Sequence, residues 1–204
     1  YMQNPHSGTT CMQFVYAAKK SQGQGWAGVY WQNPANNWGS KKGGFDLTGM
    51  TKLTFWLRGE KGGEKIEKFL VGGLKGTYPD TASVEIGPIE LTDAWKEYTI
   101  NLAGKDLTYI SGGFCWVTTV DLNPNGATFY LDDIKFELDP TMKPAVKQPV
   151  NMPFYVYADR GSLSNHYIPS GWMGDWGDIK YDAGSTEDPY LGGTCIKIVY
   201  SGAA

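Results

Sequence analysis

The sequence predicts an all-β protein built as an antiparallel β-sandwich. Apolar and polar residues alternate with a period of two in many short segments, as they do in strands with one buried face. The chain of 204 residues contains 27 Gly and 11 Pro, which supply turns, and 13 Tyr and 8 Trp, which favour strands. The pattern contains no amphipathic helix of four turns. Together these three observations indicate a sandwich or barrel of about ten short strands.

Alternation places the strands along the chain. The expected strands cover residues 11–16, 26–31, 53–57, 69–71, 84–90, 96–102, 112–119, 129–136 and 154–158. Within residues 53–57, Leu53 and Phe55 alternate with Trp56, so we expect Trp56 to point away from the core. If Val29 and Trp31 face inward, Trp26 and Tyr30 face outward by the same rule.

Turn residues separate these strands. Lys61-Gly62-Gly63, Tyr78-Pro79-Asp80 and Asn123-Pro124-Asn125-Gly126 are the clearest examples. Asn125-Gly126 stands between two apolar runs, and this dipeptide is typical of a β-hairpin. We therefore expect the strands on its two sides to pair with each other.

One stretch has a different composition. Residues 139–153 contain four prolines and no alternation, which predicts an extended linker. It separates residues 1–138, which hold most of the strands, from residues 154–204, which begin with the strand-like run Phe154-Tyr155-Val156-Tyr157.

An internal repeat links the two parts. Residues 5–16 (PHSGTTCMQFVY) and 189–200 (PYLGGTCIKIVY) share six identical positions without a gap, at an offset of 195 − 11 = 184 residues. Two copies of one strand should not fill one place in one sandwich. We therefore interpret residues 1–138 as the later strands of one unit, and residues 154–204 as the opening strands of the next. The opening strands would complete either their own chain's sandwich or that of a neighbour, because an open sheet edge would aggregate.

Composition excludes some classes of protein. The formal net charge is −3, and no basic run is longer than the pairs Lys19-Lys20 and Lys41-Lys42, so we expect no nucleic-acid partner. No apolar stretch is long enough to span a bilayer. The three cysteines, Cys11, Cys115 and Cys195, lack the paired spacing of a zinc site. They are either small buried apolar residues or, for Cys11 and Cys115, a disulfide.

Several segments together resemble the β-jelly-roll carbohydrate-binding modules of the galactose-binding-like superfamily. They are residues 25–31 (GWAGVYW), 45–49 (FDLTG), 52–59 (KLTFWLRG), 91–102 (LTDAWKEYTINL) and 129–134 (FYLDDI). The match covers about residues 25–137, with the opening strands supplied by residues 154–200. The resemblance implies a secreted or cell-surface jelly roll that binds polysaccharide without catalysis.

The resemblance also implies a structural calcium site. On the positions that match the family's pattern, Asp132 and Asp159 would be ligands, with Asp133 a weaker candidate. Ca²⁺ binds several carboxylate and carbonyl oxygens, which these residues could supply. The alternative interpretation is that they are solvated carboxylates at strand ends.

Aromatic residues are the candidate sugar ligands, because pyranose rings stack on Trp and Tyr while nearby polar groups bind the hydroxyls. The leading candidates are Trp172, Asp175 and Trp176, which lie in the Gly-rich run of residues 171–178. The others are Trp56, Trp26, Tyr30 and Trp38, the last in a polar loop. The competing interpretation is that these residues pack in the core or at its rim.

No catalytic motif is found. His6 and His166 are isolated, and nothing brings two carboxylates to glycosidase spacing, so we do not expect an enzyme. Two functions remain open. One is a polysaccharide-binding module. The other is a structural subunit of an extracellular filament, sheath or adhesin array, in which identical subunits assemble head to tail by strand complementation.

Overall fold

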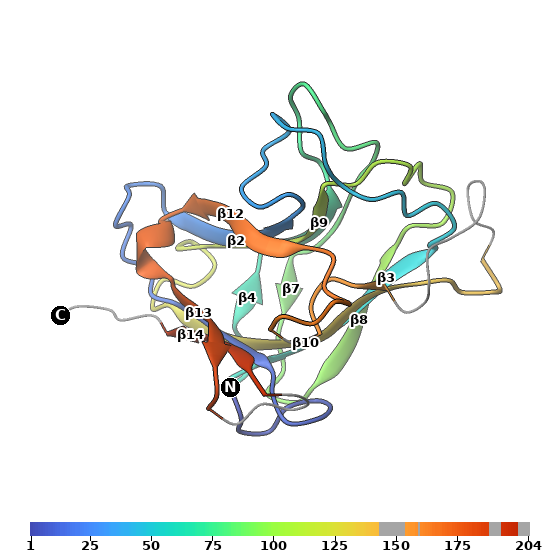
Figure 1. Cartoon of the computed structure of the whole chain (residues 1–204). Coiled ribbons are helices and arrows are strands. Elements are labelled where there is room, and N and C mark those ends of the chain that lie inside the picture. The colour runs from blue at the N-terminus through green and yellow to red at the C-terminus, as the bar shows by residue number, and fades with distance from the viewer. Residues whose placement is uncertain (143–153, 159, 188–192, 200–204) are drawn as a thin grey trace.

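The computed structural model describes residues 1–142, 154–158, 160–187 and 193–199, and shows two five-stranded antiparallel sheets packed face to face (Figure 1). Sheet I has the order β1 (Met12–Tyr16), β10 (Ala127–Glu137), β3 (Lys52–Gly59) and β8 (Lys96–Asn101), and β11 (Phe154–Tyr155) also pairs with β10. Sheet II has the order β12 (Ile168–Gly174), β2 (Trp26–Gln32), β9 (Gly112–Thr119), β5 (Lys68–Gly72) and β6 (Ser83–Ile86). The predicted antiparallel β-sandwich is therefore confirmed.

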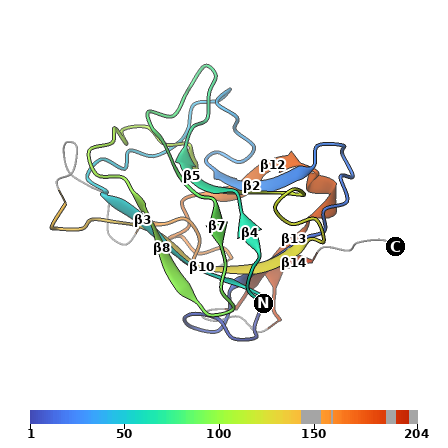
Figure 2. The same cartoon turned by 180° about the vertical axis from the view of Figure 1, so that it is seen from behind.

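Two short strand pairs complete the fold. The strands β4 (Lys65–Ile66) and β7 (Ile89–Glu90) lie between the two sheets in the view from behind (Figure 2). The strands β13 (Lys180–Ser185) and β14 (Cys195–Val199) form a hairpin next to β1. In the described part of the chain, the one helical element is the 3₁₀ turn Trp176–Asp178. No helix among these residues has the length and apolarity needed to cross a bilayer.

The core lies between the two sheets and follows the predicted alternation. Leu53, Phe55 and Leu57 of β3 are buried, and Val29 and Trp31 of β2 face them from sheet II. Aromatic rings fill much of the space, and the rings of Phe55 and Phe114 meet edge to face with their centroids 5.1 Å apart. The core positions that alternation identifies are therefore largely correct, because side chains of a strand point alternately to its two faces.

The outer face of sheet II carries a second, smaller apolar cluster. Tyr30, Leu74, Cys115 and Val117 are buried there, with Leu70 and Met173 packed against them. The hydroxyl of Tyr30 donates a hydrogen bond to the carbonyl oxygen of Gly72. The expectation that Tyr30 faces solvent is therefore wrong, because the loop after β5 covers the outward face of β2.

The Asn125-Gly126 turn does not form a hairpin. It connects β9, which pairs with β2 and β5 in sheet II, to β10, which pairs with β1 and β3 in sheet I. Gly126 has φ +81° and donates its N–H to Asn123 O at 3.0 Å, so the turn itself forms as expected. The predicted pairing is wrong because the turn chemistry is local, whereas the sheet that a strand joins is decided by which of its faces is buried.

Residues after the proline-rich stretch pack on their own chain. Val156, Tyr167, Ile196 and Ile198 belong to the same buried core as residues of β3 and β2. In this structure of a single chain, these residues complete the sandwich of their own chain. Residues 143–153 of the expected linker lie outside the described residues.

The two matching segments of the repeat occupy different places in this sandwich. β1 pairs with β10, with Met12 opposite Leu131 and Phe14 opposite Phe129. β14 lies beside β1 but pairs with β13. Its residues Ile196 and Ile198, which match Met12 and Phe14 in the repeat, are buried in the same core. The two segments therefore do not share one place, as expected of two copies of one strand. Their shared inward phase is confirmed.

Candidate functional site

Two exposed aromatic residues lie on loops at one end of sheet II, where β2 and β5 finish. Trp38 stands in the loop between β2 and β3 and is 41% exposed, and Tyr78 stands in the loop between β5 and β6 and is 39% exposed. The backbone N–H of Tyr78 donates to the carbonyl oxygen of Gly39 at 2.8 Å. The loops that carry the two rings are therefore joined one residue away from Trp38. We call Trp38 and Tyr78 the aromatic edge.

The Trp38 loop is held by hydrogen bonds to a buried side chain. Asn37 has no exposed surface, its Oδ1 accepts from the N–H groups of Gly39 and Lys41 at 3.1 and 3.0 Å, and its Nδ2 donates to Lys41 O at 2.8 Å. The ring of Trp38 meets Tyr30 edge to face at 6.2 Å, and its Nε1 donates to Asn36 Oδ1 at 3.1 Å. The indole is thus fixed in place while a large part of it remains exposed.

The Tyr78 loop is held in a similar way by Asp80. One carboxylate oxygen of Asp80 accepts from the N–H of Leu74 at 3.0 Å, and the other accepts from the N–H of Ser111 at 2.5 Å. Burial raises the pKa of Asp80, while these backbone hydrogen bonds act in the opposite direction. The carboxylate therefore holds both ends of its loop against sheet II.

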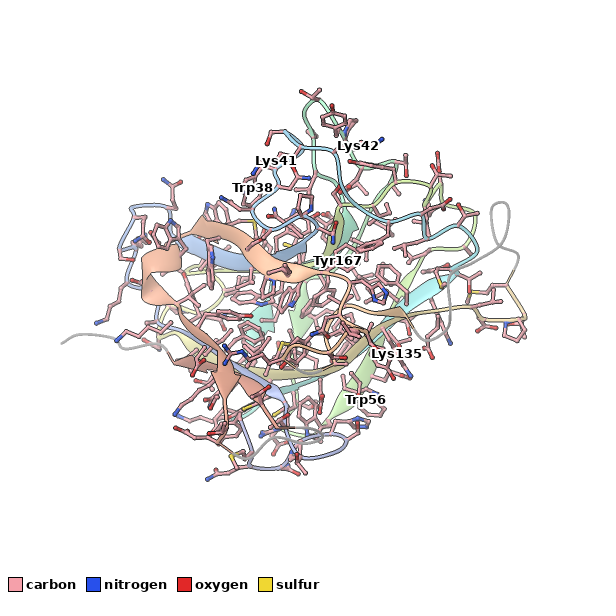
Figure 3. All side chains as sticks on the ribbon, in the orientation of Figure 1. Trp38, Lys41, Lys42, Trp56, Lys135 and Tyr167 are labelled. Carbon is pink, nitrogen blue, oxygen red and sulfur yellow. The ribbon has the colours of Figure 1, made fainter. Side chains whose placement is uncertain are left out.

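The two loops of the aromatic edge also carry three lysines. Lys41, Lys42 and Lys75 are exposed on the same two loops, and Figure 3 shows Lys41 and Lys42 on the side of the molecule that carries Trp38. Residues 33–44 and 73–79 contain no Asp or Glu. Asp46 and Asp80 follow these stretches, so the charged side chains next to Trp38 and before Tyr78 are lysines, in a chain whose net charge is −3.

The predicted site in residues 171–178 is divided between surface and interior. Trp176 is 52% exposed on the 3₁₀ turn. Trp172 is half-buried against the core, with its ring edge to face on Tyr181 at 5.6 Å. Asp175 is completely buried and accepts backbone N–H bonds from Gln22 at 2.6 Å and Gly25 at 2.9 Å. Asp175 is therefore a structural anchor for the loop before β2, and its side chain has no exposed surface in this structure.

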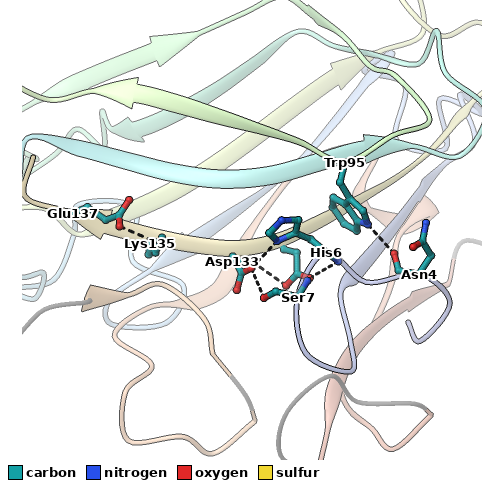
Figure 4. Close-up of polar contacts among 8 residues, drawn as sticks. Asn4, His6, Ser7, Trp95, Asp133, Lys135 and Glu137 are labelled. Carbon is teal, nitrogen blue, oxygen red and sulfur yellow. Dashed lines mark hydrogen bonds and ion pairs between the residues drawn. The ribbon is translucent and has the colours of Figure 1, made fainter.

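Trp56 points outward from β3 as predicted, yet its face is not free. The imidazole of His6 stacks on it with the centroids 3.4 Å apart and the planes at 14°. The N-terminal segment that carries His6 crosses the outer face of sheet I, and Asn4 O in the same segment accepts from Trp95 Nε1 at 2.8 Å (Figure 4). Trp26 is half-buried and packs on the cluster around Tyr30. Neither Trp56 nor Trp26 presents an open ring face comparable to that of Trp38.

Asp132 and Asp133 lie where β10 bulges. Asp132 Oδ2 accepts from the backbone N–H groups of His6 and Ser7 at 3.1 and 3.3 Å, and its Oδ1 accepts from the N–H of Asp133 at 2.9 Å. Asp133 Oδ2 meets His6 Nδ1 at 3.0 Å and accepts from Ser7 Oγ at 2.5 Å (Figure 4). Burial raises the pKa of Asp132 to about 7, and the charge of Asp133 adds to this.

A cavity of about 460 Å³ adjoins these two carboxylates. Its lining comprises Ser7, Thr10, Cys11, Met12, Leu131, Asp132, Asp133, Ile134, Tyr155, Tyr157, Ala158, Ser162 and Ile196. Ca²⁺ requires six to eight oxygen ligands. Among the described residues, no three His, Cys, Asp or Glu side chains gather as a metal cluster, and both oxygens of Asp132 already accept backbone N–H bonds. Asp159 lies outside the described residues. The described residues thus supply two carboxylates beside this cavity, and the calcium site stays a prediction.

All three cysteines are buried free thiols. Burial raises the pKa of Cys11 to about 12 and also raises the pKa of Cys115. Cys115 lies in the small cluster on the outer face of sheet II, whereas Cys11 precedes β1 of sheet I. The interpretation of these residues as small apolar groups is confirmed.

Sequence reasoning missed Tyr78 as a site residue. It identified Tyr78-Pro79-Asp80 only as a turn, and a large aromatic residue inside a turn is a signal that could have found it. The hydrogen bond from its N–H to Gly39 O joins two loops that lie about forty residues apart in the chain, so only the fold brings them together.

Comparisons with known proteins do not add a family. No family model matches the chain, and no curated protein matches its sequence.

Proposed function

We propose that this protein is a non-catalytic, extracellular β-sandwich of the jelly-roll kind that binds polysaccharide through its aromatic edge. The observation that carries the proposal is the exposed indole of Trp38, held by Tyr30 and Asn36 and joined through Gly39 to the loop of Tyr78. An aromatic face fixed before binding loses little conformational freedom when a ligand stacks on it.

The chemistry of the edge suits a sugar polymer. The C–H face of a pyranose ring is apolar and packs on an indole, while hydroxyl groups hydrogen-bond to adjacent amides. Asn36 lies next to the indole and is itself exposed. Two aromatic residues on neighbouring loops could contact successive sugar units of one chain.

The charges of the edge favour an acidic polysaccharide over a neutral one. Lys41, Lys42 and Lys75 would attract carboxylate or sulfate groups, and such attraction between exposed charges weakens with salt. The carboxylate nearest to Tyr78, that of Asp80, accepts backbone N–H bonds from Leu74 and Ser111 and so serves to hold its loop, which supports binding without hydrolysis. Calcium remains a prediction that depends on Asp159.

Affinity electrophoresis tests the proposal. The folded chain should be retarded in gels that contain polygalacturonate, less in gels with a neutral β-glucan, and less again when salt is added. Trp38→Ala should weaken binding at least about tenfold, and Tyr78→Ala should weaken it by a smaller factor. Trp176→Ala is the matched control, because Trp176 is also an exposed Trp and lies on the 3₁₀ turn, away from these two loops.

Two results would overturn the assignment. One is a Trp38→Ala chain that migrates like the wild type. The other is loss of retardation in Trp176→Ala alone, which would place the site on residues 171–178. If neither polygalacturonate nor the neutral β-glucan retards the wild-type chain, the proposed function itself is overturned.

A further inference from the structure

We propose that residues 154–199 are an exchangeable segment, which can leave the sandwich of its own chain and complete the sandwich of a second copy of this chain. The proposal is independent of polysaccharide binding. It rests on the length of the connection to this segment, on the contacts that the segment makes, and on the sequence shared by β1 and β14.

The connection is much longer than packing within one chain requires. Phe154 pairs directly with Phe136, so the chain returns to the place that it left. A hairpin loop of two to five residues would be enough for this return. After the end of β10 at Glu137, the chain instead uses residues 138–153, which are 153 − 137 = 16 residues. Fully extended, such a connection spans roughly 55–60 Å, which is sufficient to reach an adjacent molecule.

The contacts of the segment can be reproduced between copies. Its links to the rest of the sandwich are the pairings β11 with β10 and β12 with β2, together with buried Val156, Tyr167, Ile196 and Ile198. Tyr167 donates to Ile110 O at 3.1 Å, and Asp175 accepts from the loop before β2. A second copy offers identical partners to each of these groups, so exchange changes no contact within a sandwich, and protein concentration determines how often it occurs.

The sequence shared by β1 and β14 means that the strand of one copy and the strand of the next have similar inward faces where two copies meet. β1 fits the edge of β10 through Met12 and Phe14, and β14 carries Ile196 and Ile198 at the matching positions. β14 at present pairs with β13, through Ile198 opposite Tyr181. Both strands thus bury the side chains at their matching positions. Exchange in series would join copies head to tail, and reciprocal exchange would give a closed dimer.

A disulfide between β10 and β11 distinguishes packing within one chain from exchange between chains. Lys135 and Tyr155 are opposite each other in β10 and β11, so a chain with Lys135→Cys and Tyr155→Cys can form a disulfide there. The protein is incubated at low and at hundredfold higher concentration, oxidised, and separated on a denaturing gel without reductant. We expect covalent dimers and larger multiples to increase about tenfold or more at the higher concentration. Either single variant is the control for adventitious links through the native thiols.

A shortened connection provides the second control. A chain that lacks residues 141–150 keeps seven residues between Phe136 and Phe154, enough for the hairpin but with a reach of roughly 25 Å. Light scattering without any introduced cysteine should show concentration-dependent assembly of the full chain and a folded monomer for the shortened chain. Only intrachain disulfides at every concentration would overturn the proposal, as would equal assembly of the full and shortened chains.

Discussion

The imidazole of His6 lies flat on the indole of Trp56, with ring centroids 3.4 Å apart and planes inclined by 14°. His6 comes from the segment before β1, and the same ring reaches Asp133 Oδ2 at 3.0 Å through Nδ1. The chain therefore covers the aromatic residue that alternation directs outward from β3. Trp56 therefore points out of the core, as alternation predicts, but His6 covers its ring and it does not form an open platform.

His6→Ala should uncover Trp56. We expect the free energy of unfolding to fall by about 1–2 kcal/mol, because the ring stack and the bond to Asp133 are both lost. Denaturant titration measures this change, and His6→Phe, which keeps only a stack, should lose less. Retardation by polygalacturonate should stay unchanged, since Trp38 is untouched. A gain of retardation in His6→Ala would show that Trp56 is a platform once exposed.

Asp132→Asn should alter how stability depends on pH. The folded chain binds the Asp132 proton with a pKa of about 7, whereas an unfolded chain binds it near pH 4. The stability contributed by this group is complete below about pH 4 and is lost as the pH rises through about 7. The amide cannot ionise, so the fall in unfolding free energy between pH 4 and pH 8 should shrink by roughly 3 kcal/mol.

The measurement is denaturant unfolding across that pH range, with exposed Asp182→Asn as the control. If Asp132→Asn and the wild type lose the same stability between pH 4 and pH 8, Asp132 does not carry this dependence.

Asp175→Ala should destabilise the fold. Its buried carboxylate accepts N–H bonds from Gln22, Gln24 and Gly25, which would lose their partner. We expect a loss of about 2–4 kcal/mol in unfolding free energy, because hydrogen bonds to a charged group are strong and unmet donors are costly. Asp182→Ala removes an exposed carboxylate with one such bond, to Gly184, and should cost less than about 1 kcal/mol. Equal effects of the two changes would refute the anchoring role.

Gly39→Ala should separate the two loops of the aromatic edge. Gly39 has φ +86°, and a Cβ there would collide with the carbonyl oxygen of Lys75. Gly63 is the matched control, since it has φ +89° with open space around the added carbon. Gly63→Ala should cost about 1 kcal/mol of backbone strain, and Gly39→Ala clearly more. Retardation by polygalacturonate should drop only for Gly39→Ala. An unchanged affinity of that variant would show that the joined loops are not needed for binding.

Local pattern predicted the strands well and the pairing of strands poorly. The alternation of Leu53, Phe55 and Leu57 identified a core strand, because side-chain direction in a strand depends on nearest neighbours alone. Asn125-Gly126 formed its turn but not the expected hairpin, since partner choice depends on surfaces far away in the chain. For the same reason, the match between residues 5–16 and 189–200 revealed shared inward phase but not the separate places of β1 and β14.

The sequence by itself determined the all-β class, the inward residues of the main strands and the outward direction of Trp56. Only the tertiary structure decided which outward aromatic residues stay open. It buried Tyr30 under the loop after β5, covered Trp56 with His6, and joined the Trp38 and Tyr78 loops through Gly39. The physical reason is that alternation fixes the face of a sheet on which a side chain lies, whereas exposure depends on whichever distant segment packs over that face.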